Sequence, residues 1–135
     1  MKFLTIALLL VFGGCTKVET VLPQPVLGTK LEASVATELV FQEGLSLKVT
    51  KIEDSRCPKN VTCVWAGVAR VFLTISEKGI SKDATIDFES KAIQTSIELG
   101  SQKYTIEVSD VLPYPENSGE TNQNVYKVVL LVKKG

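Results

Sequence analysis

Apolar and polar residues alternate through much of the chain from residue 38 onward. Leu45, Leu47 and Val49, for example, alternate with polar neighbours. This period of two is typical of a strand that buries one face. The same pattern, with many β-branched and aromatic residues, predicts strands at 38–41, 45–52, 68–76, 85–89, 93–99, 104–109 and 125–133.

Turn residues separate these segments, and almost no stretch shows a helical period. Gly44 and Gly79 lie between alternating segments, and Pro113 ends the segment before it, because proline cannot donate to a sheet ladder. Val129 and Leu131 add apolar residues to the second face of the last strand, which predicts a central strand. About seven short strands predict an all-β domain: an antiparallel β-sandwich of the Ig-like or Greek-key type, or a small β-barrel.

The start of the chain has a different pattern. Lys2 precedes an apolar run at residues 3–12, and Gly13 and Gly14 stand directly before Cys15. A basic start, a short apolar run and small residues before a cut site are typical of a secretory signal. The run is too short for a spanning helix, which needs roughly 20 residues. With Cys as the first residue after the cut, the segment resembles a bacterial lipoprotein signal.

That resemblance implies a lipid on Cys15, and two acyl chains make a stable membrane anchor. Thr16 stands where Asp retains lipoproteins at the inner membrane of well-studied Gram-negative bacteria, so the resemblance implies the outer membrane. We therefore expect a signal peptide at 1–14, a lipidated flexible tether at 15–31 and a single β-domain at 32–135.

Composition and missing motifs exclude several classes of function. Fifteen Lys and Arg balance fifteen Asp and Glu, so no broad basic field is available for nucleic acid. The chain has no His, the commonest general base and the commonest metal ligand. It also lacks a G-x-S-x-G elbow and a Gly-rich phosphate loop. We therefore expect no enzyme, no cofactor and no nucleic-acid partner.

Two of the three cysteines remain once Cys15 is assigned to lipid. In an oxidising compartment, Cys57 and Cys63 form an even pair, which predicts a disulfide. It would close a short loop and stabilise it by roughly 2 kcal/mol. A metal site is the competing interpretation, but two Cys without His complete a usual zinc shell only with carboxylates. We expect the disulfide and no metal.

The densest motif surrounds these cysteines. Residues 53–69 combine both cysteines, the only Trp, a Pro, a Gly and several charges. Residues 54–58 read DSRCP, and Cys63 and residues 65–69 follow. Together they resemble the "DSRCP…C.WAG.A" signature of small, mostly uncharacterised bacterial lipoproteins and secreted domains, and the PYP segment at 113–115 matches the end of that family. The resemblance implies a family without implying an activity.

The motif has two interpretations. In the first it is a structural staple: Cys63 and Trp65 share a strand face, Trp65 covers the disulfide, and Arg56 neutralises a nearby carboxylate. In the second, Arg56, Lys59 and Trp65 rim a binding surface, since Arg and aromatic residues dominate binding hot spots. A protruding tip at Lys59 and Asn60 would favour enzyme inhibition, whereas a loop folded under Trp65 would favour the staple.

The function expected from these features is that of a non-catalytic cell-envelope lipoprotein, a structural or binding module. Its partners are the membrane, through lipid on Cys15, and an unknown envelope protein or small ligand. The alternative is an inhibitor of a hydrolase, a protease or a lysozyme, because a preorganised disulfide-fixed loop loses little entropy on binding. Calcium binding through Glu53 and Asp54 is a third option.

Overall fold

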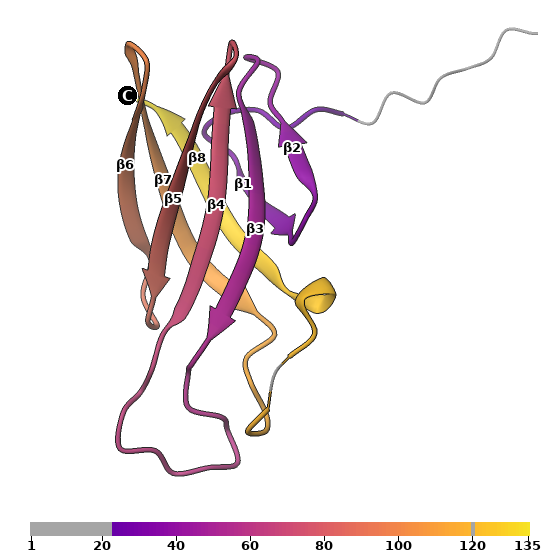
Figure 1. Ribbon diagram of the computed structural model, residues 1–135, viewed down its shortest axis with the longest axis vertical. Coiled ribbons are helices and arrows are strands. Elements are labelled where there is room, and N and C mark those ends of the chain that lie inside the picture. The colour runs from indigo at the N-terminus through magenta and orange to yellow at the C-terminus, as the bar shows by residue number, and fades with distance from the viewer. Residues whose placement is uncertain (1–22, 120) are drawn as a thin grey trace, which may run out of the picture.

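The computed structural model describes residues 23–119 and 121–135 (Figure 1). The expected signal peptide, Cys15 and the first part of the expected tether lie outside these residues. Within them the chain forms eight strands and one short 3-10 helix. These elements are β1 (Lys30–Ser34), β2 (Glu38–Val40), β3 (Ser46–Asp54), β4 (Ala69–Glu77), β5 (Ile80–Phe88), β6 (Ile93–Leu99), β7 (Gln102–Leu112), η1 (Gln123–Val125) and β8 (Lys127–Lys134).

The strands form two antiparallel four-stranded sheets that pack face to face. One sheet has the order β1-β8-β7-β6 and the other β2-β3-β4-β5. The chain crosses from one sheet to the other at the β1–β2 and β5–β6 connections. In the first sheet the last strand, β8, lies between β1 and β7. This architecture confirms the antiparallel β-sandwich. As its two apolar faces predict, β8 is an inner strand.

The hydrophobic core lies between the two sheets. Every second residue of β4 is buried, and so is every second residue from Val128 to Val132 in β8. Burying one such aliphatic side chain stabilises the fold by about 1.5–3 kcal/mol. The core includes Leu47, Val49, Ile52, Val71, Leu73, Ile75, Ile86, Ile106, Val108, Leu130 and Val132.

Strand β1 is the element that the sequence pattern does not predict. Lys30 and Leu31, expected in the tether, pair with β8. Just before them, the Gly28 N–H donates to the Val132 carbonyl at 2.7 Å. The five residues of β1 alternate polar and apolar, but Leu31 and the small Ala33 are the only apolar ones, and the prolines and Gly28 before them favour a tether. The ordered part of the chain therefore begins before residue 32.

The two ends of the sandwich carry different connections. At one end the turns of the β2–β3, β4–β5 and β6–β7 hairpins are short, and the Gln42 N–H donates to the Pro25 carbonyl at 3.1 Å. The described chain therefore begins at this end, the upper one in Figure 1. The connections at 55–68, 89–92 and 113–126 lie at the opposite end.

Candidate functional site

A loop closed by a disulfide projects from this second end (Figure 1). Cys57 and Cys63 are bonded, with their Cα atoms 5.8 Å apart, which confirms the predicted disulfide. None of residues 55–68 belongs to a strand. Residues 58–66 form the outermost part of the loop, and we call them the tip.

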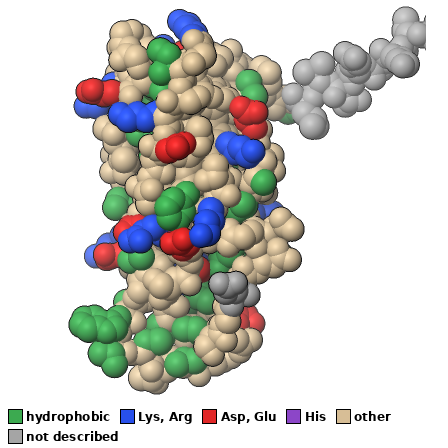
Figure 2. All heavy atoms as spheres, viewed as in Figure 1, with side chains coloured by type: hydrophobic (Ala, Val, Ile, Leu, Met, Phe, Trp, Pro, Cys, Tyr) green, Lys and Arg blue, Asp and Glu red, His purple; other side chains and the backbone are tan. Residues whose placement is uncertain are grey.

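The tip exposes large apolar side chains. Val64 is 89% exposed, Trp65 is 82% exposed and Val61 is 46% exposed. Figure 2 shows hydrophobic side chains gathered at this end of the molecule. The chain carries no charged residue from 60 to 69. A contiguous exposed apolar patch on a folded domain marks an interaction site.

Trp65 does not cover the disulfide, so this part of the staple interpretation is wrong. The prediction placed Cys63 and Trp65 two apart on one strand, where their side chains would share a face. Because both residues lie in a loop, that rule does not apply, and Cys63 is itself exposed. The single Trp of the chain faces solvent instead.

Arg56 is buried, so it does not rim an exposed surface. Only 3% of the residue is exposed. Its Nε and Nη2 atoms donate to the two carboxylate oxygens of Asp54 at 2.8 and 2.6 Å. Its Nη1 and Nη2 atoms donate to the carbonyls of Val111 and Pro113 at 2.9 and 3.0 Å. A planar guanidinium suits such a bidentate pair, and the role of Arg56 is therefore structural.

Two tyrosines complete this cluster. The Tyr114 ring centroid is 4.8 Å from Cζ of Arg56, and the Tyr114 hydroxyl donates to the Cys57 carbonyl at 2.9 Å. The Tyr126 hydroxyl donates to Oδ2 of Asp54 at 3.1 Å. Burial raises the pKa of Tyr126 above its ordinary value of 10, and the Asp54 carboxylate raises it as well. Tyr126 therefore stays a neutral donor at physiological pH. We call Asp54, Arg56, Tyr114 and Tyr126 the arginine clamp.

The two arms of the loop meet just outside the sheets. The Ser55 N–H donates to the Val68 carbonyl at 2.9 Å, and the Cys57 N–H donates to the Ala66 carbonyl at 2.9 Å. Gly67 has a φ of 69°, and a Cβ atom there would lie 1.8 Å from the Ser55 carbonyl oxygen. Only glycine fits this contact, which explains the glycine of the motif.

The 113–126 connection lies against the tip. The Lys59 N–H donates to the Pro115 carbonyl at 3.1 Å, and Asn60 Nδ2 lies 3.4 Å from Asn117 Oδ1. The motif and the PYP segment, far apart in the sequence, therefore form one structural unit. Through the clamp and these contacts, the second segment fixes the direction in which the tip projects.

Two of the three surface residues predicted from the sequence lie on the tip. Lys59 and Trp65 are exposed there, whereas Arg56 is buried beneath it. Sequence reasoning missed Val61 and Val64. The signal that reveals them is the absence of charge from 60 to 69 in a segment too irregular to be a strand.

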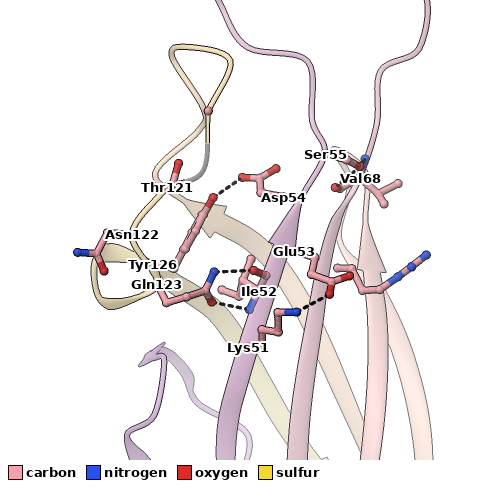
Figure 3. A pocket seen from close by; sticks show the side chains of 12 residues that line it. Lys51, Ile52, Glu53, Asp54, Ser55, Val68, Thr121, Asn122, Gln123 and Tyr126 are labelled. Carbon is pink, nitrogen blue, oxygen red and sulfur yellow. Dashed lines mark hydrogen bonds and ion pairs between the residues drawn. The ribbon is translucent and has the colours of Figure 1, made fainter.

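A cleft of about 970 Å³ lies beside the clamp, between β3, the start of β4 and residues near η1 (Figure 3). The Gln123 side chain crosses it to β3, where it accepts from the Ile52 N–H at 2.9 Å and donates to the Ile52 carbonyl at 2.8 Å. These are the bonds that a neighbouring strand would make. Lys51 and Glu53 form an ion pair at 2.6 Å on the same side. The cleft therefore has a mixed polar and apolar lining, and the Gln123 side chain that crosses it is bonded to β3.

In residues 23–119 and 121–135, no group of three or more His, Cys, Asp or Glu residues gathers as a metal site requires. The two carboxylates considered for calcium have other partners, since Glu53 pairs with Lys51 and Asp54 with Arg56. The same part of the chain contains no helix that is both long and apolar enough to cross a membrane.

Comparison with known proteins yields no match: no family model, no curated protein and no solved structure matches the chain. The features of this chain that suggest a function are therefore the tip and the clamp that holds it.

Proposed function

We propose that this chain is a non-catalytic binding module of the cell envelope, anchored in the outer membrane by lipid on Cys15. The module binds its partner through the tip. The observation that carries the proposal is the exposure of Val64 and Trp65 on a loop whose base is fixed by the disulfide and the clamp. A preorganised loop loses little entropy on association. Trp is also among the residues most enriched at binding hot spots.

The place where the described chain begins supports this proposal. Gln24, near the start of the described chain, contacts Gln42 at the end opposite the tip. Between Cys15 and Pro23 an extended chain spans at most about 29 Å. A lipid on Cys15 would therefore hold the near end of the sandwich close to the membrane and leave the tip directed away from it, where another envelope protein can reach it.

The contacts of the acidic residues in the motif support a non-catalytic role. In a chain without His, carboxylates such as Glu53 and Asp54 are the natural candidates for acid–base chemistry. Asp54 is fixed by Arg56 and Tyr126, and its side chain is only 4% exposed. Glu53 pairs with Lys51 on the surface. Each carboxylate thus has a structural explanation.

A second candidate is inhibition of a hydrolase, a protease or a lysozyme. Lys59 and Asn60 are exposed on a projecting, disulfide-closed loop, which is the arrangement expected of an inhibitor rather than of a staple. Inhibition would be a special case of binding through the tip, in which the loop enters the active-site cleft of the partner and blocks it.

Two measurements on the full chain, made in the cells that produce it, test the two parts of the proposal. For the anchor, mass spectrometry should find diacylated Cys15 in the mature protein, and Cys15→Ala should abolish membrane sedimentation or block processing. An unmodified Cys15 in the mature protein would rule the anchor out.

For inhibition, the purified chain should lower a protease or lysozyme activity of the same envelope, and the double variant Val64→Ser/Trp65→Ser should not. If the protease and lysozyme activities stay unchanged at a large excess of the purified chain, the chain is not an inhibitor of these enzymes.

A further inference from the structure

We infer that the tip inserts into an apolar recess on a folded envelope protein, with Val64 and Trp65 as the inserted anchor and Lys59 at its rim. The inference rests on the proposed function and specifies the partner surface. Val64 and Trp65 are the two most exposed large apolar residues in the part of the chain that the structure describes.

The shape of the tip requires a concave partner. The loop projects beyond the sheets, and its two arms are joined at the base by the Ser55–Val68 and Cys57–Ala66 hydrogen bonds. A flat partner would cover only the outermost atoms of such a projection. Binding energy concentrates where an anchor side chain fills a desolvated pocket, so the complementary surface is a recess.

The chemistry of the tip requires that this recess be apolar. No charged residue occurs from 60 to 69, so the tip offers no partner to a buried charge on the other protein. A charge buried without a partner is strongly unfavourable. Lys59 stands at one edge of the uncharged stretch, where it can remain hydrated. Binding should therefore depend little on ionic strength.

A second copy of this chain does not supply the recess. The cleft beside the clamp is lined in part by Lys51, Glu53 and Arg70, and the Gln123 side chain crosses it to bond Ile52, so an entering Trp would have to break these bonds and desolvate charges. Contact between two tips would also leave each Trp65 without a pocket, because both surfaces project from the sandwich.

The chain's own membrane is a poorer occupant than a protein. Trp and aliphatic residues at a loop tip suit a lipid interface, but the anchored end of the domain lies opposite the tip. Lys59 is the one cation in residues 58–66, which gives little attraction to anionic lipid.

Photocrosslinking in cells tests the inference with the full, lipidated chain. A benzoylphenylalanine probe replaces Val64 in one form and Val40 in a matched control; Val40 is 45% exposed on β2, away from the tip. Light should produce an adduct between this chain and one different protein from position 64 but not from position 40. Adding Trp65→Ser to the probe-bearing chain should lower the yield about tenfold or more, whereas high salt should not.

Binding to the purified crosslinked protein completes the test. In a chain without the probe, Trp65→Ser should weaken binding to the crosslinked protein about 30-fold or more. Val40→Ser should leave this affinity unchanged. Equal binding by the wild-type chain and Trp65→Ser would overturn the inference.

The other outcomes separate this inference from the proposed function. An adduct of twice the mass of the chain would indicate a second copy. Insertion into vesicles of phosphatidylethanolamine and phosphatidylglycerol, seen as a blue shift of the single Trp, would indicate a membrane. Either result overturns the recess but leaves the tip as a binding surface. No adduct from position 64, in a chain that melts like the wild type, would overturn both.

Discussion

The two ends of the sandwich reverse the chain by different physical means. At the end where the described chain begins, Gly79 lies in a short turn at a φ of 79°, and a Cβ atom there would meet nothing within 4 Å. At the tip end, Gly67 has a similar φ of 69°, but its Cα faces the Ser55 carbonyl directly. The first glycine permits a turn, whereas the second permits two chain segments to pack. Local turn chemistry is sufficient for the short turn, but the long loop at 55–68 needs tertiary contacts to hold one conformation.

The ion pairs at the tip end show the same distinction. Arg56 and Asp54 are buried with side-chain exposures of 1% and 4%, and they bond two backbone carbonyls and a tyrosine. Arg70 and Asp87 form an equally short pair on the surface of β4 and β5, with exposures of 45% and 44%. A buried pair of this kind fixes a specific arrangement more than it adds stability, and it becomes costly when one partner is lost.

Replacing Arg56 by Leu should have the largest effect. It leaves the buried Asp54 carboxylate without its cation, and breaking a buried pair in this way destabilises a protein by about 3–5 kcal/mol. The matched control, Arg70→Leu, removes an exposed, solvent-screened pair and should change stability little. Urea unfolding of both variants measures the difference. Equal losses would mean that the clamp is no more important than a surface pair.

Alanine at Gly67 should have the next largest effect. Gly79→Ala imposes only the positive φ, which costs about 1–2 kcal/mol. Gly67→Ala adds an overlap with the Ser55 backbone and should cost about 3 kcal/mol or more, because the two arms must separate. Thermal unfolding of the two variants compares the two ends directly. A smaller loss for Gly67→Ala than for Gly79→Ala would contradict the packed arrangement.

Removing the disulfide should have a moderate effect. Cys57→Ser with Cys63→Ser should lower the free energy of unfolding by roughly 2 kcal/mol, the chain-entropy value for so short a loop. Because the clamp holds the base of the loop independently, amide exchange should rise in residues 58–66 while the sheets stay protected. Exchange that also rises throughout β3 and β4 at low denaturant would show that the disulfide, and not the clamp, fixes this end.

Most strands of the sandwich can be predicted from the sequence, because apolar and polar residues alternate wherever one face of a strand is buried. The prediction fails in two places. The first residues of β5, Ile80–Asp83, are all exposed on an edge strand and show no alternation, so the predicted strand starts too late. In β1 the alternation consists of Leu31 and Ala33 alone, directly after a Pro- and Gly-containing stretch that favours a tether.

The candidate site is less predictable than the fold. The two cysteines and the DSRCP run identify its position, and an even Cys pair in an expected oxidising compartment predicts the disulfide. The burial of Arg56 depends on carbonyls at 111 and 113, which no local pattern connects to residue 56. The exposure of Trp65 depends on where β4 begins, because a strand that continued the alternation of β4 back through Cys63 would have turned its ring inward.

Substitutions at the tip itself should have the smallest effect on stability. Val64 and Trp65 are almost fully exposed, so replacing either by Ser should change the free energy of unfolding by no more than about 0.5 kcal/mol. Val71→Ser, at a fully buried valine of β4, is the control and should cost about 2 kcal/mol or more. Acrylamide should quench the fluorescence of Trp65 almost as efficiently as that of free tryptophan. Strong protection from acrylamide, or a loss of stability like that of Val71→Ser, would show that the tip packs against the domain. In that case its apolar residues would belong to the fold. If instead the tip variants keep full stability and lose binding, the apolar residues are there for the partner, because the fold gains nothing from them.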